Sequence, residues 1–115
     1  MATTTQVQRI NLILTILLLQ DHGYWVAQCL EYDVTAQGKN IDEAMTAFER
    51  TLVGQVLLDT EQGKQPLSGI GQAPKQFFDL SKKARRLTDS VPFYVPPQQP
   101  NVLVNARVED LRICA

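Results

Sequence analysis

The stretch from Leu12 to Leu19 constrains the fold most, because it is apolar over eight residues with only Thr15 interrupting it. Within Arg9 to Gln20 both alternating sets of positions are apolar, which is typical of a strand covered on both faces, although its length also fits a short helix. A bilayer-spanning helix needs about 20 apolar residues, so this segment is not expected to cross a membrane.

Turn signals and β-formers follow at once. Asp21-His22-Gly23 is typical of a hairpin turn, with Gly23 able to take positive φ. Tyr24 to Leu30 is aromatic and β-branched, which predicts a second strand, and Val34 to Gln37 predicts a short third one. Three consecutive antiparallel strands are therefore expected.

A helix is expected next. Asn40 is a favourable N-cap residue, and Glu43 stands three positions later, where it can reach back as in a capping box. Apolar residues then recur at helical spacing, the pattern of a helix that packs on a sheet: Ile41, Ala44, Met45, Phe48, Leu52 and Val56. Gly54 lies within this helix and either allows a backbone to cross closely or is simply tolerated.

Residues 61–101 are expected to add a loop, a second helix and a proline-rich arm. Pro74 can open the helix, which is predicted to run to about Leu87 with an apolar stripe of Phe77, Leu80, Ala84 and Leu87. The arm is expected to be extended and polyproline-like because of Pro92, Pro96, Pro97 and Pro100.

The last segment, Val102 to Ile113, alternates between apolar and polar residues and predicts a half-exposed strand. At 115 residues the chain is expected to be one domain spanning 1–115. The predicted class is α+β, an antiparallel sheet with helices packed on it, in the order β-β-β-α-α-β.

Several of these residues resemble the HicB antitoxin family. The glycine-led strand Gly23-Tyr24-Trp25-Val26-Ala27, the turn Gln37-Gly38 and the helical pair Glu43-Ala44 carry the likeness, which covers about residues 10–58. The resemblance implies an antiparallel sheet crossed by one helix, similar to double-stranded-RNA-binding domains and to a reduced RNase H-like layout. It also implies a non-catalytic protein that self-associates and neutralises a small RNA-cleaving toxin.

The chain departs from the family in two places. Glu31-Tyr32-Asp33-Val34 stands where the family has a proline- and glycine-bearing turn, and no recognisable C-terminal DNA-binding segment follows the shared region. Two residues of the pattern also have a direct physical interpretation. Gly38 suits a turn that needs an unusual φ, and Ala44 suits a helix lying close on a sheet.

No catalytic, metal or cofactor site is expected. His22 is the only histidine and lies in a predicted turn. Asp21 is separated from Glu31 and Asp33 by the whole second strand, roughly 30 Å at about 3.3 Å per residue, so these carboxylates are not expected to converge on two metal ions. Cys29 and Cys114 lack the spacing of a disulfide framework or a metal site, which indicates reduced thiols in a cytoplasmic protein.

Charge is distributed unevenly along the chain. Residues 21–61 hold eight acids against two bases, while residues 64–86 hold six bases against one acid. The two regions either neutralise each other in the fold or form two surfaces for different partners. The acidic region, with an aromatic strand nearby, suits a small basic protein partner, and its candidate contact residues are Tyr24, Trp25, Glu31, Tyr32 and Asp33.

Two further expectations concern partners. Self-association into a dimer or larger assembly is expected because the first strand is apolar on both faces and one helix covers only one, unless the second helix covers the other within the monomer. Nucleic-acid binding is the alternative function, through phosphate contacts from Lys82, Lys83, Arg85 and Arg86.

Overall fold

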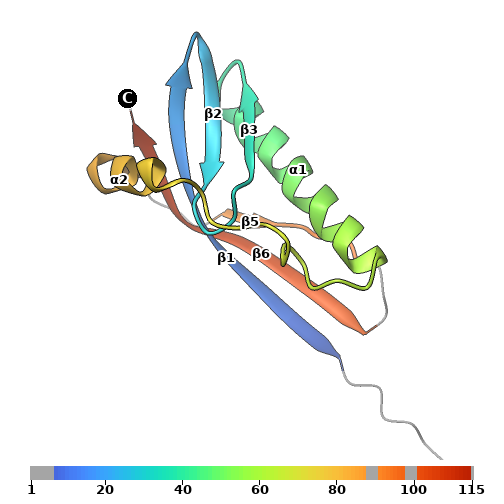
Figure 1. The fold of residues 1–115 in the computed structure, drawn as a ribbon. Helices are drawn as coiled ribbons and strands as arrows, with labels where there is room; N and C mark the ends of the chain where they lie inside the picture. Colours follow the sequence, from blue (N-terminus) through green and yellow to red (C-terminus); the bar gives the residue numbers. More distant parts are fainter. Residues whose placement is uncertain (1–6, 88–90, 98–100, 115) are drawn as a thin grey trace, which may run out of the picture.

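The protein is an α+β structure built on one mixed sheet with two helices (Figure 1). The computed structural model describes residues 7–87, 91–97 and 101–114. The elements along the chain are β1 (Gln8–Asp21), β2 (Tyr24–Cys29), β3 (Thr35–Gly38), α1 (Ile41–Glu61), α2 (Lys75–Lys83), β4 (Arg85–Leu87), β5 (Val91–Phe93) and β6 (Val102–Cys114). The strands lie in the order β3-β2-β1-β6-β4, and β5 also pairs with β6.

The predicted hairpin is confirmed. β1 and β2 pair antiparallel from Asp21↔Tyr24 to Ile16↔Cys29, and β2 pairs antiparallel with β3. His22 and Gly23 form the turn with φ of 49° and 84°, a left-handed pair that matches the twist of the two strands. The alternative of a short helix for the apolar segment is therefore wrong.

The prediction of an antiparallel sheet is wrong for its central pair. β6 runs parallel to β1 from Gln8↔Val102 to Leu19↔Cys114, with one register shift at Leu14/Thr15. A parallel pair needs a long crossover connection, and here the connection is the whole chain between Asp21 and Val102. The alternation predicted for β6 is confirmed, since Ala106 and Val108 are buried while Asn105 and Arg107 are exposed.

The first helix, α1, lies across one face of the sheet, as predicted (Figure 1). The N–H of Glu43 donates to Asn40 Oδ1 at 2.8 Å, which is the expected cap, and Glu43 Oε2 accepts from the N–H of Lys39 at 2.8 Å. Fully buried Ala44, Phe48, Leu52 and Val56 face the core together with Leu12, Leu14, Ile16 and Leu18 of β1.

Gly38 is required for close packing and not for its backbone angle. Gly23 and Gly63 are the glycines with positive φ among the described residues, so the expected unusual φ at Gly38 is wrong. A methyl group on Gly38 would lie 2.5 Å from the backbone N of Ala44 and 2.6 Å from Glu43 Cβ. The close approach expected at Ala44 is therefore confirmed, and Gly38 makes it possible.

The second helix is shorter than predicted. It ends at Lys83, and Arg85–Leu87, expected to be helical, forms β4 and pairs antiparallel with β6. Leu80, assigned to the buried stripe, is 37 % exposed, whereas Ser81 is buried. Pairing with the long strand β6 therefore overrides the helical pattern near the end of α2.

This helix covers part of the sheet face opposite α1. Arg112 Nη1 donates to the carbonyl oxygen of Ser81 at 3.0 Å, and Arg112 lies beside Leu17 in the β1–β6 register. Leu17 is fully buried, while Ile13, four residues earlier on the same face, is 51 % exposed. Hence the second helix covers the upper part of this face within the monomer.

The proline-rich segment folds back onto its own chain instead of forming an unpaired arm. Val91–Phe93 is β5 and pairs with β6, and the Phe93 ring lies 5.9 Å from the Phe48 ring between centroids. Val95 is also buried. Pairing with β6 and burial of Phe93 and Val95 therefore determine the structure of this segment despite Pro92, while Pro100 lies outside the described residues.

The shape is elongated, with extents of 60 × 26 × 24 Å. The long pair β1–β6 extends beyond the shorter strands at its lower end (Figure 1). Neither described helix has the length and apolar character needed to span a membrane.

Candidate functional site

The five residues predicted to bind a partner do not form one surface. Tyr24 and Trp25 begin β2 next to the hairpin turn, whereas Glu31, Tyr32 and Asp33 follow the other end of that strand. Tyr24 is 45 % exposed, and Trp25 and Tyr32 are half-buried and pack against the core. Trp25 therefore packs against the core, while Tyr24, its neighbour on the strand, is the more exposed of the two.

Glu31 is occupied by contacts within the fold. Its Oε1 accepts from the backbone N–H of Thr15 at 2.6 Å, and its Oε2 accepts from the Thr15 hydroxyl at 2.7 Å. Thr15 is the first residue of β1 beyond the last β1–β2 partner, Ile16↔Cys29. The carboxylate therefore satisfies the edge of β1 where β2 ends, which gives Glu31 a role within the fold.

The neighbouring cysteine is buried in the core. Cys29 is fully buried, and its Sγ donates to Glu31 Oε1 at 3.7 Å. Burial, and secondly the charge of Glu31, raises the pKa of the Cys29 thiol to about 12, although backbone hydrogen bonds to Tyr32 and Glu31 act the other way. The thiol is therefore protonated at neutral pH, the form that is least nucleophilic.

The acids considered for a metal site make separate contacts with different partners within the fold. His22 Nδ1 is paired with the neighbouring Asp21 carboxylate in the exposed turn. Asp33 Oδ1 accepts from the buried amide of Gln28 at 3.0 Å. Throughout the described ranges, no group of three or more His, Cys, Asp and Glu side chains is placed to hold a metal ion.

The basic cluster lies where α2 gives way to β4. It consists of Lys82 and Lys83 in the last turn of the helix and Arg85 and Arg86 in the strand, and all four are exposed. Placing all four on one helix was wrong. Arg86 Nε lies 3.4 Å from Asp110 Oδ1, so part of its charge is balanced within the fold.

A groove on the outer surface of α1 was not predicted. It has a volume of about 500 Å³ and is lined by Thr46, Glu49, Arg50, Val53, Gly54, Leu57, Tyr94 and Pro96. Tyr94 is 74 % exposed and therefore presents most of its ring to solvent. No atom outside the local helix lies within 4 Å of where a Cβ of Gly54 would stand, so no backbone crosses α1 there.

An acidic hollow continues this groove toward the start of α1. It shares Thr46 and Arg50 with the groove and is also lined by Asp42 and Glu43. Gly54 was noted in the sequence, but no surface was predicted there. Tyr94 was not predicted, because the alternation of Val91, Phe93 and Val95 directs it outward only once this segment is paired with β6.

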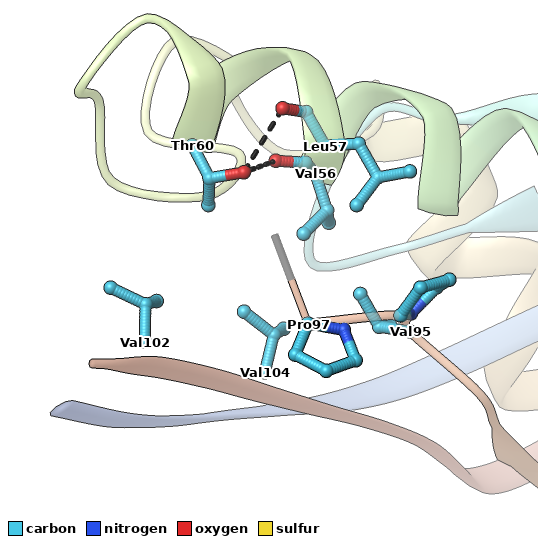
Figure 2. A pocket seen from close by; sticks show the side chains of 8 residues that line it. Val56, Leu57, Thr60, Val95, Pro97, Val102 and Val104 are labelled. Atoms are coloured by element: carbon cyan, nitrogen blue, oxygen red, sulfur yellow. Dashed lines mark hydrogen bonds between the residues drawn. The ribbon is translucent and has the colours of Figure 1, made fainter. Parts of the chain in front are cut away.

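A second hollow lies between the end of α1 and the lower end of β6 (Figure 2). Val56, Leu57, Val95, Pro97, Val102 and Val104 surround it, and the Thr60 hydroxyl donates to the carbonyl oxygens of Val56 and Leu57 at 3.1 and 3.0 Å. Its volume of about 10 Å³ holds one water molecule at most. It is a packing gap and not a ligand site.

Comparison with known proteins adds no family. No family model, curated protein or solved structure matches this chain.

Proposed function

We propose that this chain is a non-catalytic HicB-like binding protein of antitoxin type, which self-associates and binds a small basic protein along α1. The residues that resemble HicB support the assignment by their places in the fold. Gly23 to Ala27 form the turn and start of β2, Gln37-Gly38 ends β3, and Glu43-Ala44 begins α1. The observation that carries the binding proposal is the groove beside Tyr94.

The groove combines apolar area with acidic charge. Tyr94, Pro96, Val53 and Leu57 offer apolar contacts around the bare backbone of Gly54. Exposed aromatic residues are favoured at interface centres, and a groove along a helix suits an elongated segment of a partner. This surface is therefore suited to an amphipathic segment.

The charges beside the groove define the partner further. The groove and the adjoining hollow are lined by three acids, Asp42, Glu43 and Glu49, and by one base, Arg50. Complementary charge steers association and selects partners. The surface therefore favours an amphipathic segment that carries Lys or Arg.

A pull-down from native lysate, treated with nuclease and analysed by mass spectrometry, tests this proposal. Wild-type protein should retain a small basic protein, while Tyr94→Ser and Gly54→Leu should lose it, since one removes the exposed ring and the other fills the groove. Neither change disturbs the core, because Tyr94 is 74 % exposed and Gly54 faces open space.

Tyr24→Ser is the matched control, because Tyr24 is an exposed aromatic residue on β2, outside the groove. It should retain the same protein as the wild type. Retention of that protein by all four forms, or by none of them, contradicts the proposal.

The basic cluster supports nucleic-acid binding as a second candidate function. Lys82, Lys83, Arg85 and Arg86 are adjacent and exposed, and exposed bases bind phosphates in a salt-dependent manner. Reversing the charges of Lys82, Lys83 and Arg85 should abolish low-salt binding of single-stranded RNA or DNA in a fluorescence anisotropy titration. Unchanged binding, or no binding by wild type, would exclude this function.

A further inference from the structure

One side of the lower half of β1 is an open sheet edge. β2 pairs only with Ile16–Asp21, whereas β6 pairs with β1 along its length, from Gln8 onward. Within residues 7–87, 91–97 and 101–114, no strand pairs with the other side of Gln8–Leu14. This part of β1 runs along the margin of the molecule in Figure 1.

The hydrogen bonds of Thr15 show which backbone groups of β1 face the open edge. The carbonyl oxygen of Thr15 accepts from the N–H of Leu30 at 3.0 Å, and the Thr15 N–H donates to Glu31, so both Thr15 groups point to the β2 side. The register shift skips Glu109 of β6, which leaves β1 itself regular. Strand alternation then directs the N–H and C=O of Ile13, Asn11 and Arg9 to the open edge.

We propose that this edge pairs antiparallel with the same edge of a second copy, about a two-fold axis at Asn11. The inference rests on the self-association included in the proposed function and is independent of the groove. Asn11 then faces the second copy's Asn11, and Arg9 and Ile13 face the second copy's Ile13 and Arg9. The three outward residues of each copy supply a hydrogen-bond donor and acceptor apiece, so the shared ladder is complete.

Side chains also match in this register. Partly buried Ile10 faces the second copy's Leu12 on the α1 side, and because Leu12 is only 3 % exposed, this contact is apolar but small. On the other face, Ile13 is 51 % exposed and receives the aliphatic stem of the second copy's Arg9.

Charge is complementary as well. The second copy's Arg9 lies diagonally across from Thr15, whose N–H and hydroxyl hold the Glu31 carboxylate at this edge. Diagonal neighbours in an antiparallel pair are about 7–8 Å apart, within reach of an arginine. Two symmetric Arg9–Glu31 pairs then flank the ladder, and they favour a second copy over an unrelated strand.

Substitutions at Asn11 test the edge, with molecular mass measured by light scattering across a concentration series. Wild type and Asn11→Ala should be dimers, because alanine keeps the outward N–H. Asn11→Pro should be a monomer, because proline removes that donor while the groups that bind β6 belong to the neighbouring residues. Its thermal melt shows whether the fold is retained.

The two possible failures are distinguishable. A monomeric wild type at high micromolar concentration overturns self-association altogether, including that part of the proposed function. A wild-type dimer that Asn11→Pro leaves intact overturns only the pairing at this edge.

Disulfide trapping tests the register without any proline. In a Cys114→Ser background, Asn11→Cys should form a covalent dimer on mild oxidation, because facing hydrogen-bonded residues have Cα atoms about 5.5 Å apart. Ile13→Cys should not, because its counterpart is the second copy's Arg9. Equal cross-linking of both variants, or none of Asn11→Cys, overturns the proposed axis.

Discussion

Glu31 lies where pairing between β1 and β2 ends and, among the described residues, that side of β1 becomes unpaired. Its carboxylate accepts from both the N–H and the hydroxyl of Thr15 and lies 3.7 Å from the buried Cys29 thiol. One side chain therefore satisfies the β1 backbone at the end of the β2 ladder and contributes to the environment of a core thiol.

Replacement of Glu31 should measure this contribution. Glu31→Ala should lower the free energy of unfolding by about 2 kcal/mol, because a part-buried N–H and a hydroxyl lose a charged acceptor. Urea denaturation followed by circular dichroism measures it. Asp79→Ala, at an exposed position on α2, is the control, and an equal loss there would show that Glu31 has no special role.

Cys29 should make stability depend on pH in the alkaline range. Its pKa is raised from 9.0 to about 12 in the fold, so between these values the folded protein holds a proton that the unfolded chain has released. The stabilisation is fully present below pH 9 and is lost as pH rises toward 12, with a slope of at most about 1.4 kcal/mol per pH unit.

Urea denaturation at a series of alkaline pH values measures this slope. Cys29→Ala should lower stability at neutral pH and flatten the alkaline part of the curve. A wild-type curve that parallels the variant between pH 9 and 12 would contradict the raised pKa.

Single residues were predicted well where the cause was local. The Asn40–Glu43 cap and the His22-Gly23 turn depend on neighbours within four positions, and both are present. The role of Glu31 was missed because its partner, Thr15, is 16 positions away. Exposure of an acid cannot be inferred from its type alone when a strand end requires an acceptor.

At the scale of elements, α1 illustrates two different uses of glycine. Gly38 lies under its first turn with no space for a methyl group, whereas Gly54 faces open solvent in its interior. Helix propensity therefore determines the effect of substitution at Gly54, and contact between helix and sheet determines it at Gly38.

Alanine at these two positions should have opposite effects. Gly54→Ala should raise the free energy of unfolding by about 1 kcal/mol through helix propensity. Gly38→Ala should lower it by about 1–3 kcal/mol, because the backbone of Ala44 cannot move without lifting the helix. Thermal melts of both variants measure these changes in stability, and a stabilising Gly38→Ala would contradict the close contact.

Elements were predictable where pattern and partner agreed. β1, β2, β3, α1 and β6 occur at the predicted positions because each shows a local signal, namely a run of β-forming residues, strand alternation or helical spacing. Arg85–Leu87 and Val91–Phe93 were assigned to a helix and to an arm, yet both pair with β6. Three-residue strands carry no period of their own, so only the long strand beside them determines their conformation.

At the scale of the whole molecule, β6 connects most of the sheet. It pairs with β1, β4 and β5, and it contributes Ala106 and Val108 to the core. Its parallel direction was not predictable, because alternation shows which face is buried but not which way a strand runs. For the same reason, the groove at Tyr94 could not be predicted until the course of residues 91–97 was known.

Removal of β6 should therefore abolish the fold. A chain that ends after Asn101 should show no cooperative unfolding by circular dichroism, because β4 and β5 lose their partner and β1 loses one of its two. A synthetic peptide of residues 102–114 added in trans should restore the transition, whereas one with Ala106→Lys and Val108→Lys should not. Cooperative unfolding of the shortened chain alone would contradict this role.

The parallel pairing of β1 and β6 has a consequence for how the protein is made. Asn11 and Asn105 lie side by side in the sheet although they are 94 positions apart. During synthesis β1 leaves the ribosome long before β6 has been made, so the apolar side chains of β1 stay exposed. Pairing at the centre of the sheet must then wait for the synthesis of β6, and until that moment the apolar side chains of β1 are exposed and prone to aggregation.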